Sequence, residues 1–206
     1  MTFQTGAGRT GPWRLAALAA AGTSLVLLLA ACVSEPQTTP GFYRDLARVD
    51  AVVDAPSAAN MISHYRANNG LGPVRMDPAL TRQAEAQARA MAQAGNVNAS
   101  LNSGNRLQDL MAAIGQEAAP ASNNVSGGYR TLAEAFSGWR ESPKHNAVML
   151  DKQANRFGLA TAYAPSAKHK VFWSLIMAGP QVAPAGSAGT STTTAGRTPV
   201  PSPASR

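Results

Sequence analysis

The chain has one cysteine, Cys32, in 206 residues. No disulfide can form within it, so we expect the fold to be stabilised by its apolar core. Charged residues make up only 14% of the sequence, and the basic ones stand singly rather than in runs. A nucleic-acid-binding surface needs clustered basic side chains with aromatic residues between them. We therefore expect no nucleic-acid partner, and the formal net charge of +7 predicts only weak attraction to anionic surfaces.

Long apolar runs are also absent, except in the segment before Cys32. Two arginines precede an apolar stretch, residues 15–31, which ends in Leu29-Ala30-Ala31 and is followed by the cysteine. This order is similar to a bacterial lipoprotein signal, whose cysteine carries acyl chains such as palmitate and becomes the mature N-terminus. A transmembrane anchor is the alternative, but the most apolar part, residues 24–31, is short for a bilayer span.

The residues after Cys32 bear on the location of the protein. Val33 and Ser34 follow the cysteine, and no aspartate is present there to resemble a signal for retention at an inner membrane. We therefore expect a protein of the bacterial cell envelope that is anchored to a membrane by lipid. The periplasmic side of the outer membrane is the favoured location.

Composition divides the chain into four segments. Residues 1–31 form the expected signal peptide. Residues 32–57 begin as a polar, proline-containing stretch typical of a tether, with a short helix predicted over residues 43–54. Residues 58–180 carry the apolar periodicity of one folded domain. Residues 181–206 consist mostly of Ala, Gly, Ser, Thr and Pro without such a period, which predicts a disordered tail.

The folded segment predicts an α+β domain. Apolar residues at helical spacing, with capping residues or prolines at several starts, predict helices over 58–68, 78–94, 106–114, 131–142 and 143–150. A short extended piece is predicted at 74–76, and strands are predicted at 157–164 and 170–177. The last of these is rich in branched and aromatic residues, so we expect it to be buried and central. Residues 96–105 and 116–128 are predicted to be loop or irregular chain.

The most specific local pattern begins at Thr131. Thr131 and Glu134 have the spacing of a capping box, which begins a helix. Ser142 and Pro143 end that helix and begin another, because proline suits the first helical position and serine can cap it. His145 then lies in the first turn of the second helix, beside the aromatic residues of the first. The positive end of the helix dipole and burial should both lower the pKa of its imidazole.

Several stretches together resemble a known family. In chain order they read GLGPVRMDPAL, NNVSGGYRTLAEAFSGW, SPKHNAVML, FGLATAYAP and KVFWSLIMAG, and the similarity extends over residues 58–179. The pattern resembles the CAP superfamily of cysteine-rich secretory, antigen 5 and pathogenesis-related proteins, in its disulfide-free bacterial branch. The resemblance implies an α-β-α sandwich, in which a small, mainly antiparallel sheet lies between helical layers.

The same resemblance implies a cavity that is usually lined by two histidines and two acids able to hold a divalent metal. His145 matches the histidine of the SPKH turn, and the family's Glu-Asn pair falls on Asn123 and Asn124, so an amide replaces the acid. Residues 96–105 contain no second histidine, and Ser142 stands where some members carry another acid. One imidazole and neutral amides are poor zinc ligands, so no metal or other cofactor is expected. The expected pocket residues are His145, Asn123, Asn124 and Trp139.

His145 has three alternative roles: a pocket residue, a general base, or a plain helix residue without function. Ser142 and His145 could act as nucleophile and base, but Ser142 is better placed as a helix cap. Glu141 is the one nearby acid that could orient the imidazole. His64 and His169 are expected to face solvent. The aromatic residues expected in the core, rather than in a ligand cage, are Phe136, Trp139, Phe172 and Trp173.

Two functions remain open on these residues. The first is a non-enzymatic, envelope-anchored CAP domain that binds a small or lipid-like ligand, a cell-wall component or another envelope protein through a degenerate cavity. The second is a hydrolase of peptide or ester bonds that uses His145. A carboxylate within hydrogen-bond reach of His145 would favour the hydrolase, because such a base is normally oriented by an acid.

Overall fold

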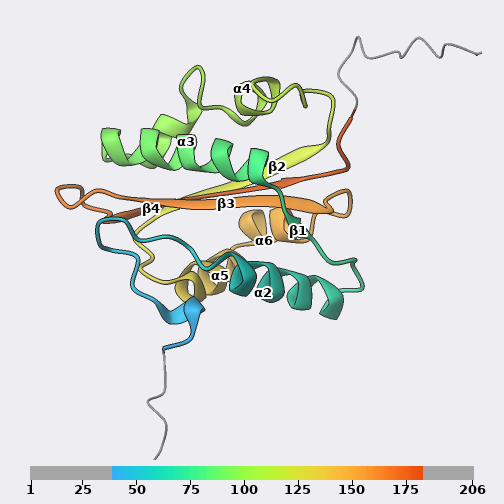
Figure 1. The fold of residues 1–206 in the computed structure, drawn as a ribbon, viewed down its shortest axis with the longest axis horizontal. Helices are drawn as coiled ribbons and strands as arrows, with labels where there is room; N and C mark the ends of the chain where they lie inside the picture. The colour runs from blue at the N-terminus through green and yellow to red at the C-terminus, as the bar shows by residue number, and fades with distance from the viewer. Residues whose placement is uncertain (1–38, 183–206) are drawn as a thin grey trace, which may run out of the picture. The chain divides into compact units, whose positions relative to one another are not determined.

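The structure is a computed structural model and describes residues 39–182. Its elements in chain order are η2 (Gly41–Tyr43), α2 (Ala55–Asn68), β1 (Arg75–Met76), α3 (Pro78–Ala94), η3 (Val97–Leu101), α4 (Leu107–Ala112), β2 (Ala121–Gly127), α5 (Leu132–Glu141), α6 (Pro143–Met149), β3 (Arg156–Tyr163) and β4 (Val171–Ala178). Figure 1 shows α3 and α4 on one face of the sheet and α2, α5 and α6 on the other. The expected α+β sandwich is therefore confirmed.

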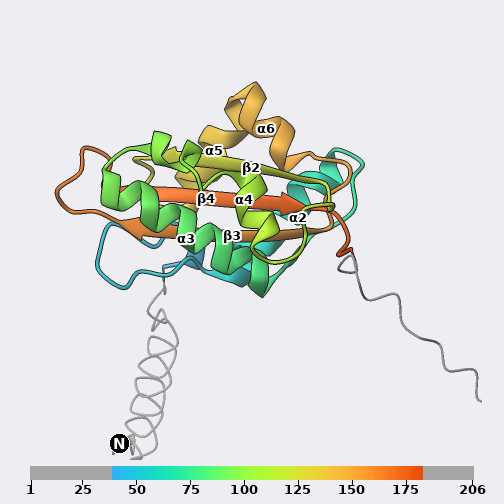
Figure 2. The same cartoon turned by 90° about the horizontal axis from the view of Figure 1, so that it is seen from above.

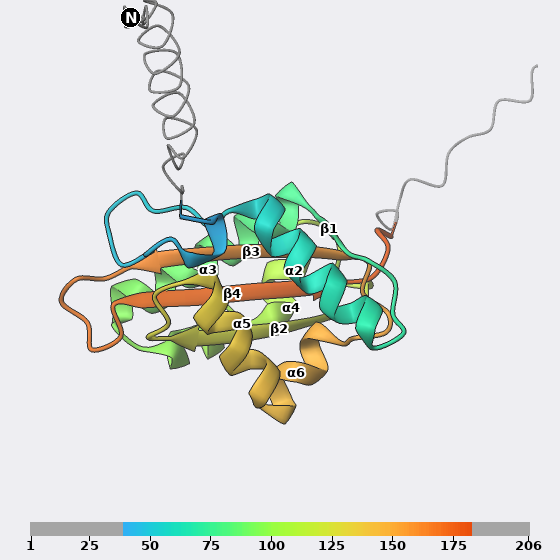
Figure 3. The ribbon, with the colours of Figure 1, turned by 90° about the horizontal axis from the view of Figure 1, so that it is seen from below.

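The sheet has four strands in the order β1-β3-β4-β2. β1 runs parallel to β3, and the other two pairings are antiparallel. The sheet is thus mainly antiparallel, as the resemblance implied. β4 lies between β3 and β2 and all eight of its residues are buried, which confirms the prediction of a central strand there. Figures 2 and 3 show the helical layer on each face in turn.

α3 packs so closely onto β3 that one strand residue has to be glycine. A Cβ atom at Gly158 would lie 2.2 Å from the backbone carbonyl carbon of Leu80, and no side-chain movement could relieve that contact. The helix begins after Asp77, whose side chain accepts hydrogen bonds from two amides of the first turn, and it ends at the left-handed Gly95. The apolar face predicted for α3 is buried: Leu80, Ala84, Ala88 and Met91.

The opposite layer is centred on two tryptophans. Trp139 on α5 and Trp173 on β4 are fully buried and meet edge to face, with ring centroids 5.9 Å apart. Each indole N–H has a partner: Trp139 donates to Ser126 Oγ, and Trp173 donates to the backbone oxygen of Tyr129. Both rings therefore belong to the core, as predicted. Of the other two aromatic residues expected there, Phe172 is buried and Phe136 is partly buried.

Arg66 stabilises this layer by hydrogen bonds from its side chain to backbone oxygens alone. It is buried, and its guanidinium donates to the backbone oxygens of Gly72, Met149, Asp151 and Ala154. These oxygens lie in the chain after α2 and around the end of α6. One side chain on α2 therefore holds both segments in place, and its burial lowers the pKa of the guanidinium.

The N-terminal boundary of the domain differs from the prediction. The helix expected over residues 43–54 is absent, and irregular chain follows the short η2. Leu46 and Val53 are buried in the main core, and Asp54 caps α2, which begins at Ala55. Residues 40–57 therefore belong to the folded domain and not to a tether. The prediction was wrong because two isolated apolar residues give no periodic signal.

The larger error concerns residues 116–128, which were predicted to be irregular. They contain β2, which pairs with β4 over its whole length. Only one of its residues, Asn124, is buried, so the strand lacks the apolar alternation by which strands are recognised. Two smaller differences are the helical turn η3 inside the predicted loop 96–105 and the shorter α4 inside the helix predicted over 106–114.

Some predictions concern residues outside 39–182. Cys32, the expected signal peptide and most of the expected C-terminal tail are among these. The first two residues assigned to the tail, Gln181 and Val182, instead bond to Asp77 and Gln116 of the domain. Within residues 39–182, no helix has both the length and the apolar character needed to cross a membrane.

Candidate functional site

A cavity of about 270 Å³ lies beside β2, at the start of α6. Three parts of the chain line it: the region from η3 to α4, the strand β2, and the first turn of α6. The lining residues are Ser100, Leu101, Arg106, Leu107, Asn123, Val125, Lys144 and His145. The cavity thus contains His145 and Asn123 from the predicted pocket set, but neither Asn124 nor Trp139.

Asn123 and Asn124 have different roles because successive side chains of a strand point to opposite faces. Asn123 Nδ2 donates to Gln87 Oε1 at 3.3 Å, on the side of α3. Asn124 is buried, and its Nδ2 donates to the backbone oxygen of His145 at 2.9 Å. Asn124 therefore holds α6 against β2, whereas Asn123 presents its amide to the cavity.

Gln87, in the middle of α3, supports the cavity and was not predicted. It is fully buried, and its Oε1 accepts hydrogen bonds from Asn123 and from Ser174 Oγ, the latter at 2.7 Å. Its Nε2 donates to the backbone oxygen of Asn105 at 2.7 Å. One amide thus connects α3, the loop before α4 and two strands. In the sequence, Gln87 could have been noticed as a polar residue three positions after Ala84, on the otherwise apolar face of the helix.

His145 lies in the first turn of α6, which begins at Pro143, as predicted. Burial lowers the pKa of its imidazole first, and the neighbouring Lys144 ammonium lowers it further. The direction agrees with the prediction, and so does burial as its first cause, but the second cause is Lys144 and not the predicted helix dipole. The ring is therefore neutral at neutral pH, with one nitrogen that donates and one that accepts hydrogen bonds.

Ser142 does not form the predicted side-chain cap. It occupies the N-cap position of α6, but its Oγ makes no capping hydrogen bond. Its backbone oxygen accepts from the amide of Asn146, a bond that any residue could make. Ser142 is also not among the described residues that line the cavity, and no carboxylate is among them either. The described lining of this cavity therefore lacks the oriented serine, base and acid of a nucleophilic site.

Two basic side chains give the cavity a positive character. Arg106 pairs with Asp109, with 3.0 Å between Nε and Oδ2, so part of its charge is offset. Lys144 is exposed and forms no ion pair with a residue in 39–182. Leu101 and Leu107 add apolar surface to the same cavity. Neither cation could be singled out beforehand, because basic residues are scattered throughout this sequence.

The cavity residues do not fit a divalent metal. Zinc takes three or four His, Cys or carboxylate ligands, and His145 is the one such residue in the described lining. Across residues 39–182, no three His, Cys, Asp or Glu side chains gather closely enough to hold a metal ion. Arg106 and Lys144 would moreover repel a cation. The cavity suits an anionic or neutral polar group.

The two other histidines lie elsewhere. His64 is exposed, as predicted. His169 is half-buried rather than solvent-facing, because its ring packs edge to face on Phe172 with centroids 6.4 Å apart. The hairpin also brings the Cβ atom of His169 close to Gly127. A Cβ atom added at that glycine would lie 2.9 Å from it. Neither histidine can supply a second imidazole to the His145 cavity.

The family is settled by a match to its sequence model. The model of the CAP family, described as the cysteine-rich secretory protein family, matches residues 59–177. This range is more than half of the chain, and the chain therefore belongs to the CAP family. A comparison with curated protein sequences gives no match.

Solved structures with a similar fold include two bacterial proteins. An outer surface protein from Borrelia burgdorferi gives a TM-score of 0.53 at 12% sequence identity, over 64% of this chain and 98% of that one. An extracellular protein from Bacillus anthracis that contains an SCP domain gives a TM-score of 0.52 at 15% identity, over 71% of this chain and 45% of that one. The match thus spans less than half of the second protein. At these identities, the likeness shows a shared fold alone.

Proposed function

We propose that this CAP protein binds a small anionic, lipid-like ligand in the His145 cavity without catalysing a reaction. The observation that carries the proposal is the set of groups around the cavity. A neutral imidazole and an amide offer hydrogen bonds, Arg106 and Lys144 offer positive charge, and two leucines and a valine offer apolar surface. A ligand with an anionic head group and an apolar portion satisfies all three kinds of group.

The size of the cavity limits the ligand. Its volume of about 270 Å³ is slightly below the range of about 300 to 1,000 Å³ that is usual for small-molecule sites. A head group with a short apolar portion would occupy it. A cell-wall polymer or another envelope protein would need a wider contact surface than this cavity offers.

Binding is favoured over hydrolysis by the surroundings of His145. No carboxylate contributes to its pKa, and none lines the cavity within the described residues. A hydrolytic dyad also needs a nucleophile hydrogen-bonded to the base, and Ser142 lies outside the set of lining residues. Asn123, in the place of the family's acid, can bind a polar group but cannot take up a proton.

Hexyl phosphate tests the ligand-binding proposal. We expect isothermal titration calorimetry at neutral pH to show binding to the mature protein, and weaker binding of both inorganic phosphate and hexanol. Lys144→Met should weaken binding by about tenfold, the effect of one lost charge-assisted contact. Lys168→Met removes a similar exposed charge at the β3–β4 hairpin and should leave binding unchanged. Binding that neither Lys144→Met nor His145→Ala weakens would show that the cavity is not the site.

We propose further that Cys32 is the mature N-terminus and carries lipid, so that the domain is held on the periplasmic side of the outer membrane. The support is the basic, apolar leader that ends in Leu29-Ala30-Ala31, since stable anchoring takes more than one acyl chain. Mass spectrometry of the membrane fraction should find diacyl or triacyl Cys32 as the first residue. A soluble protein that keeps Leu29, or an unmodified Cys32 thiol, would refute this part of the proposal.

A further inference from the structure

The outer edge of β3 is unpaired over most of its length. β1 is only two residues long and pairs with the first two residues of β3, Arg156 and Phe157. The backbone oxygen of Phe157 faces β1, where it accepts a hydrogen bond from Asp77. From Leu159 onwards, no strand among residues 39–182 lies on that side of β3.

Three residues of β3 present their backbone groups at this edge. The direction of backbone N–H and C=O alternates along a strand. Since Phe157 faces outward, the N–H and C=O groups of Leu159, Thr161 and Tyr163 face outward too, away from β4. No described backbone or side-chain group bonds to them on that side. They form a row of free donors and acceptors at the spacing of a β-ladder.

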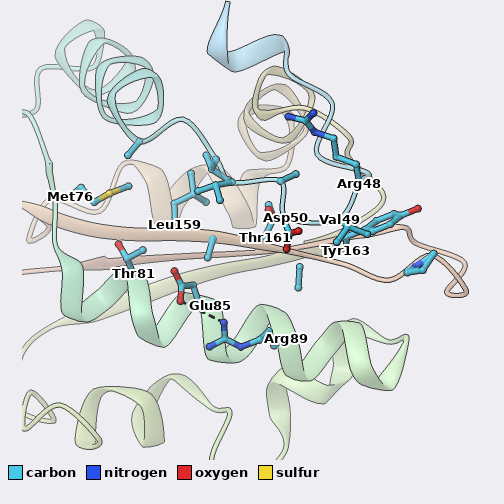
Figure 4. A pocket seen from close by; sticks show the side chains of 17 residues that line it. Arg48, Val49, Asp50, Met76, Thr81, Glu85, Arg89, Leu159, Thr161 and Tyr163 are labelled. Carbon is cyan, nitrogen blue, oxygen red and sulfur yellow. Dashed lines mark ion pairs between the residues drawn. The ribbon is translucent and has the colours of Figure 1, made fainter.

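A cavity of about 600 Å³ runs along this edge (Figure 4). Five consecutive residues of β3, Leu159–Tyr163, line it. One wall is α3, which contributes Thr81, Glu85 and Arg89, and the other is the irregular segment 48–53. No lining residue is shared with the His145 cavity, which lies beside β2 at the opposite edge of the sheet. The two sites are therefore separate.

The two walls of this cavity differ in character. On α3, Glu85 and Arg89 form an exposed ion pair with 3.6 Å between Oε2 and Nη1. On the other wall, Val49 and Val52 are 73% and 77% exposed and offer apolar surface. A chain lying along β3 would direct alternate side chains to the two walls. A complementary chain therefore has apolar residues facing the valines and polar residues facing the ion pair.

We propose that an extended peptide segment of a partner protein, with alternating apolar and polar residues, binds here as an added β-strand beside β3. Unpaired strand edges template such pairing, and soluble proteins normally block them. Here α3 and residues 48–53 flank the edge on both sides and leave it partly exposed at Thr161 and Tyr163, whereas Leu159 is buried at 3% exposure. We take the occupant to be a single extended chain, because a second folded copy would bring its own helical layers against α3 and residues 48–53.

The test uses the full mature protein labelled with ¹⁵N and a synthetic probe. The probe is an acetylated, amidated seven-residue peptide in which valine alternates with serine and lysine. We expect its addition to shift the amide signals of Leu159, Thr161 and Tyr163 and to slow their hydrogen exchange. The amides of Asn123 and His145 should not respond. No response of the β3 amides at millimolar peptide, or a response at the His145 cavity instead, would overturn the proposal.

Two N-methylated isomers of the probe test whether the peptide forms backbone hydrogen bonds with β3. In one isomer every valine amide is methylated, and in the other every serine and lysine amide. An added strand donates to β3 through only one of these two sets of amides. One isomer should therefore bind and the other should not. Equal binding of both isomers, or of neither, is incompatible with an added strand.

Two substitutions at Thr161 test the same backbone hydrogen bonds by changing the protein instead of the peptide. Thr161→Pro removes one outward N–H without breaking a bond to β4, and proline is tolerated at such edge positions. It should weaken probe binding by about tenfold, whereas Thr161→Val keeps the N–H and should bind as the wild type does. Slow exchange of the Thr161 and Tyr163 amides in the protein alone would mean that its own chain or a second copy already covers the edge, which would also overturn the proposal.

Discussion

At the scale of single residues, Asp77 has two structural roles. It caps α3, and its Oδ2 accepts a hydrogen bond from Arg156 Nη1 at 2.7 Å, in a pair whose side chains are 8% and 1% exposed. Arg156 also donates to the backbone oxygen of Gly179 at 2.7 Å. Burial raises the pKa of Asp77, but Arg156 and the two helix amides lower it more, so the pKa lies below its ordinary value.

Asp77→Asn separates these two roles, because asparagine also caps helices well but leaves Arg156 without a counter-charge. We expect the free energy of unfolding at neutral pH to fall by about 3 kcal/mol, as measured by urea denaturation. Since the folded pKa is lowered, the contribution of Asp77 is present above the unfolded pKa of about 3.9 and is lost as the pH falls through the folded value. The difference between the two proteins should therefore shrink in acid.

The control for this substitution is Asp45→Asn. Asp45 pairs with Arg130, and both side chains are largely exposed, so its loss should have a much smaller effect. If Asp77→Asn destabilised the protein no more than Asp45→Asn does, the buried pair would not have the structural importance assigned to it.

The residues of the candidate site were predictable to different degrees. The position of His145 followed from Pro143, because proline determines where the helix begins. The sequence did not indicate which of Asn123 and Asn124 lines the cavity. That depends on which face of β2 is covered, and β2 itself was not predicted. Gln87 left only a weak signal, a polar residue on the apolar face of α3, and Lys144 directly precedes His145 but is one of many scattered basic residues. The place of His145 in the chain could thus be predicted, but most of the residues that line the cavity with it could not.

At the scale of elements, the two helices of the α5–α6 corner begin differently. Thr131 Oγ1 accepts the amide of Glu134 at 3.2 Å, so the first half of the predicted capping box is confirmed. Glu134 Oε2 accepts the amide of Arg130, at 2.7 Å, rather than that of Thr131. Ser142 occupies the N-cap position of α6, but its side chain makes no capping hydrogen bond. The start of α6 therefore depends on Pro143 and on tertiary contacts.

This difference predicts unequal effects of two alanine substitutions. Thr131→Ala should lower the free energy of unfolding by about 1 kcal/mol, because a cap is lost. Ser142→Ala should change it by only a few tenths of a kcal/mol, within the range of ordinary surface substitutions. Ser142→Ala should also leave the binding of hexyl phosphate unaltered. An equal cost for both substitutions in chemical denaturation would show that Ser142 Oγ does cap the helix.

Elements with strong local chemistry were predicted, and those without it were not. α3 has an aspartate cap, a first-turn proline, a periodic apolar face and a terminal glycine, and its bounds agree with the prediction. β4 is apolar except for Ser174 and was recognised as the central strand. β2 is held by pairing with β4 and by a buried asparagine, which a pattern based on hydrophobicity cannot detect.

At the scale of the whole domain, the α-β-α arrangement followed from the family resemblance, since element order alone indicated only α+β. The N-terminal boundary could not be predicted, because Leu46 and Val53 reach the core from an irregular segment. That segment also forms one wall of the cavity beside β3. The domain therefore has two separate cavities, one beside β2 and one beside the part of β3 that extends past β1.

The proposed function requires His145 to be a neutral imidazole in a cavity that receives an anion. This requirement can be checked by NMR titration of the His145 ring with and without saturating hexyl phosphate. Without ligand, the midpoint should lie below about 6.5, because burial and Lys144 disfavour the imidazolium. With hexyl phosphate it should rise, because a nearby anion stabilises that form. The ring signals of exposed His64 should not respond to the ligand. A His145 midpoint at the ordinary value that hexyl phosphate does not move would contradict the claim.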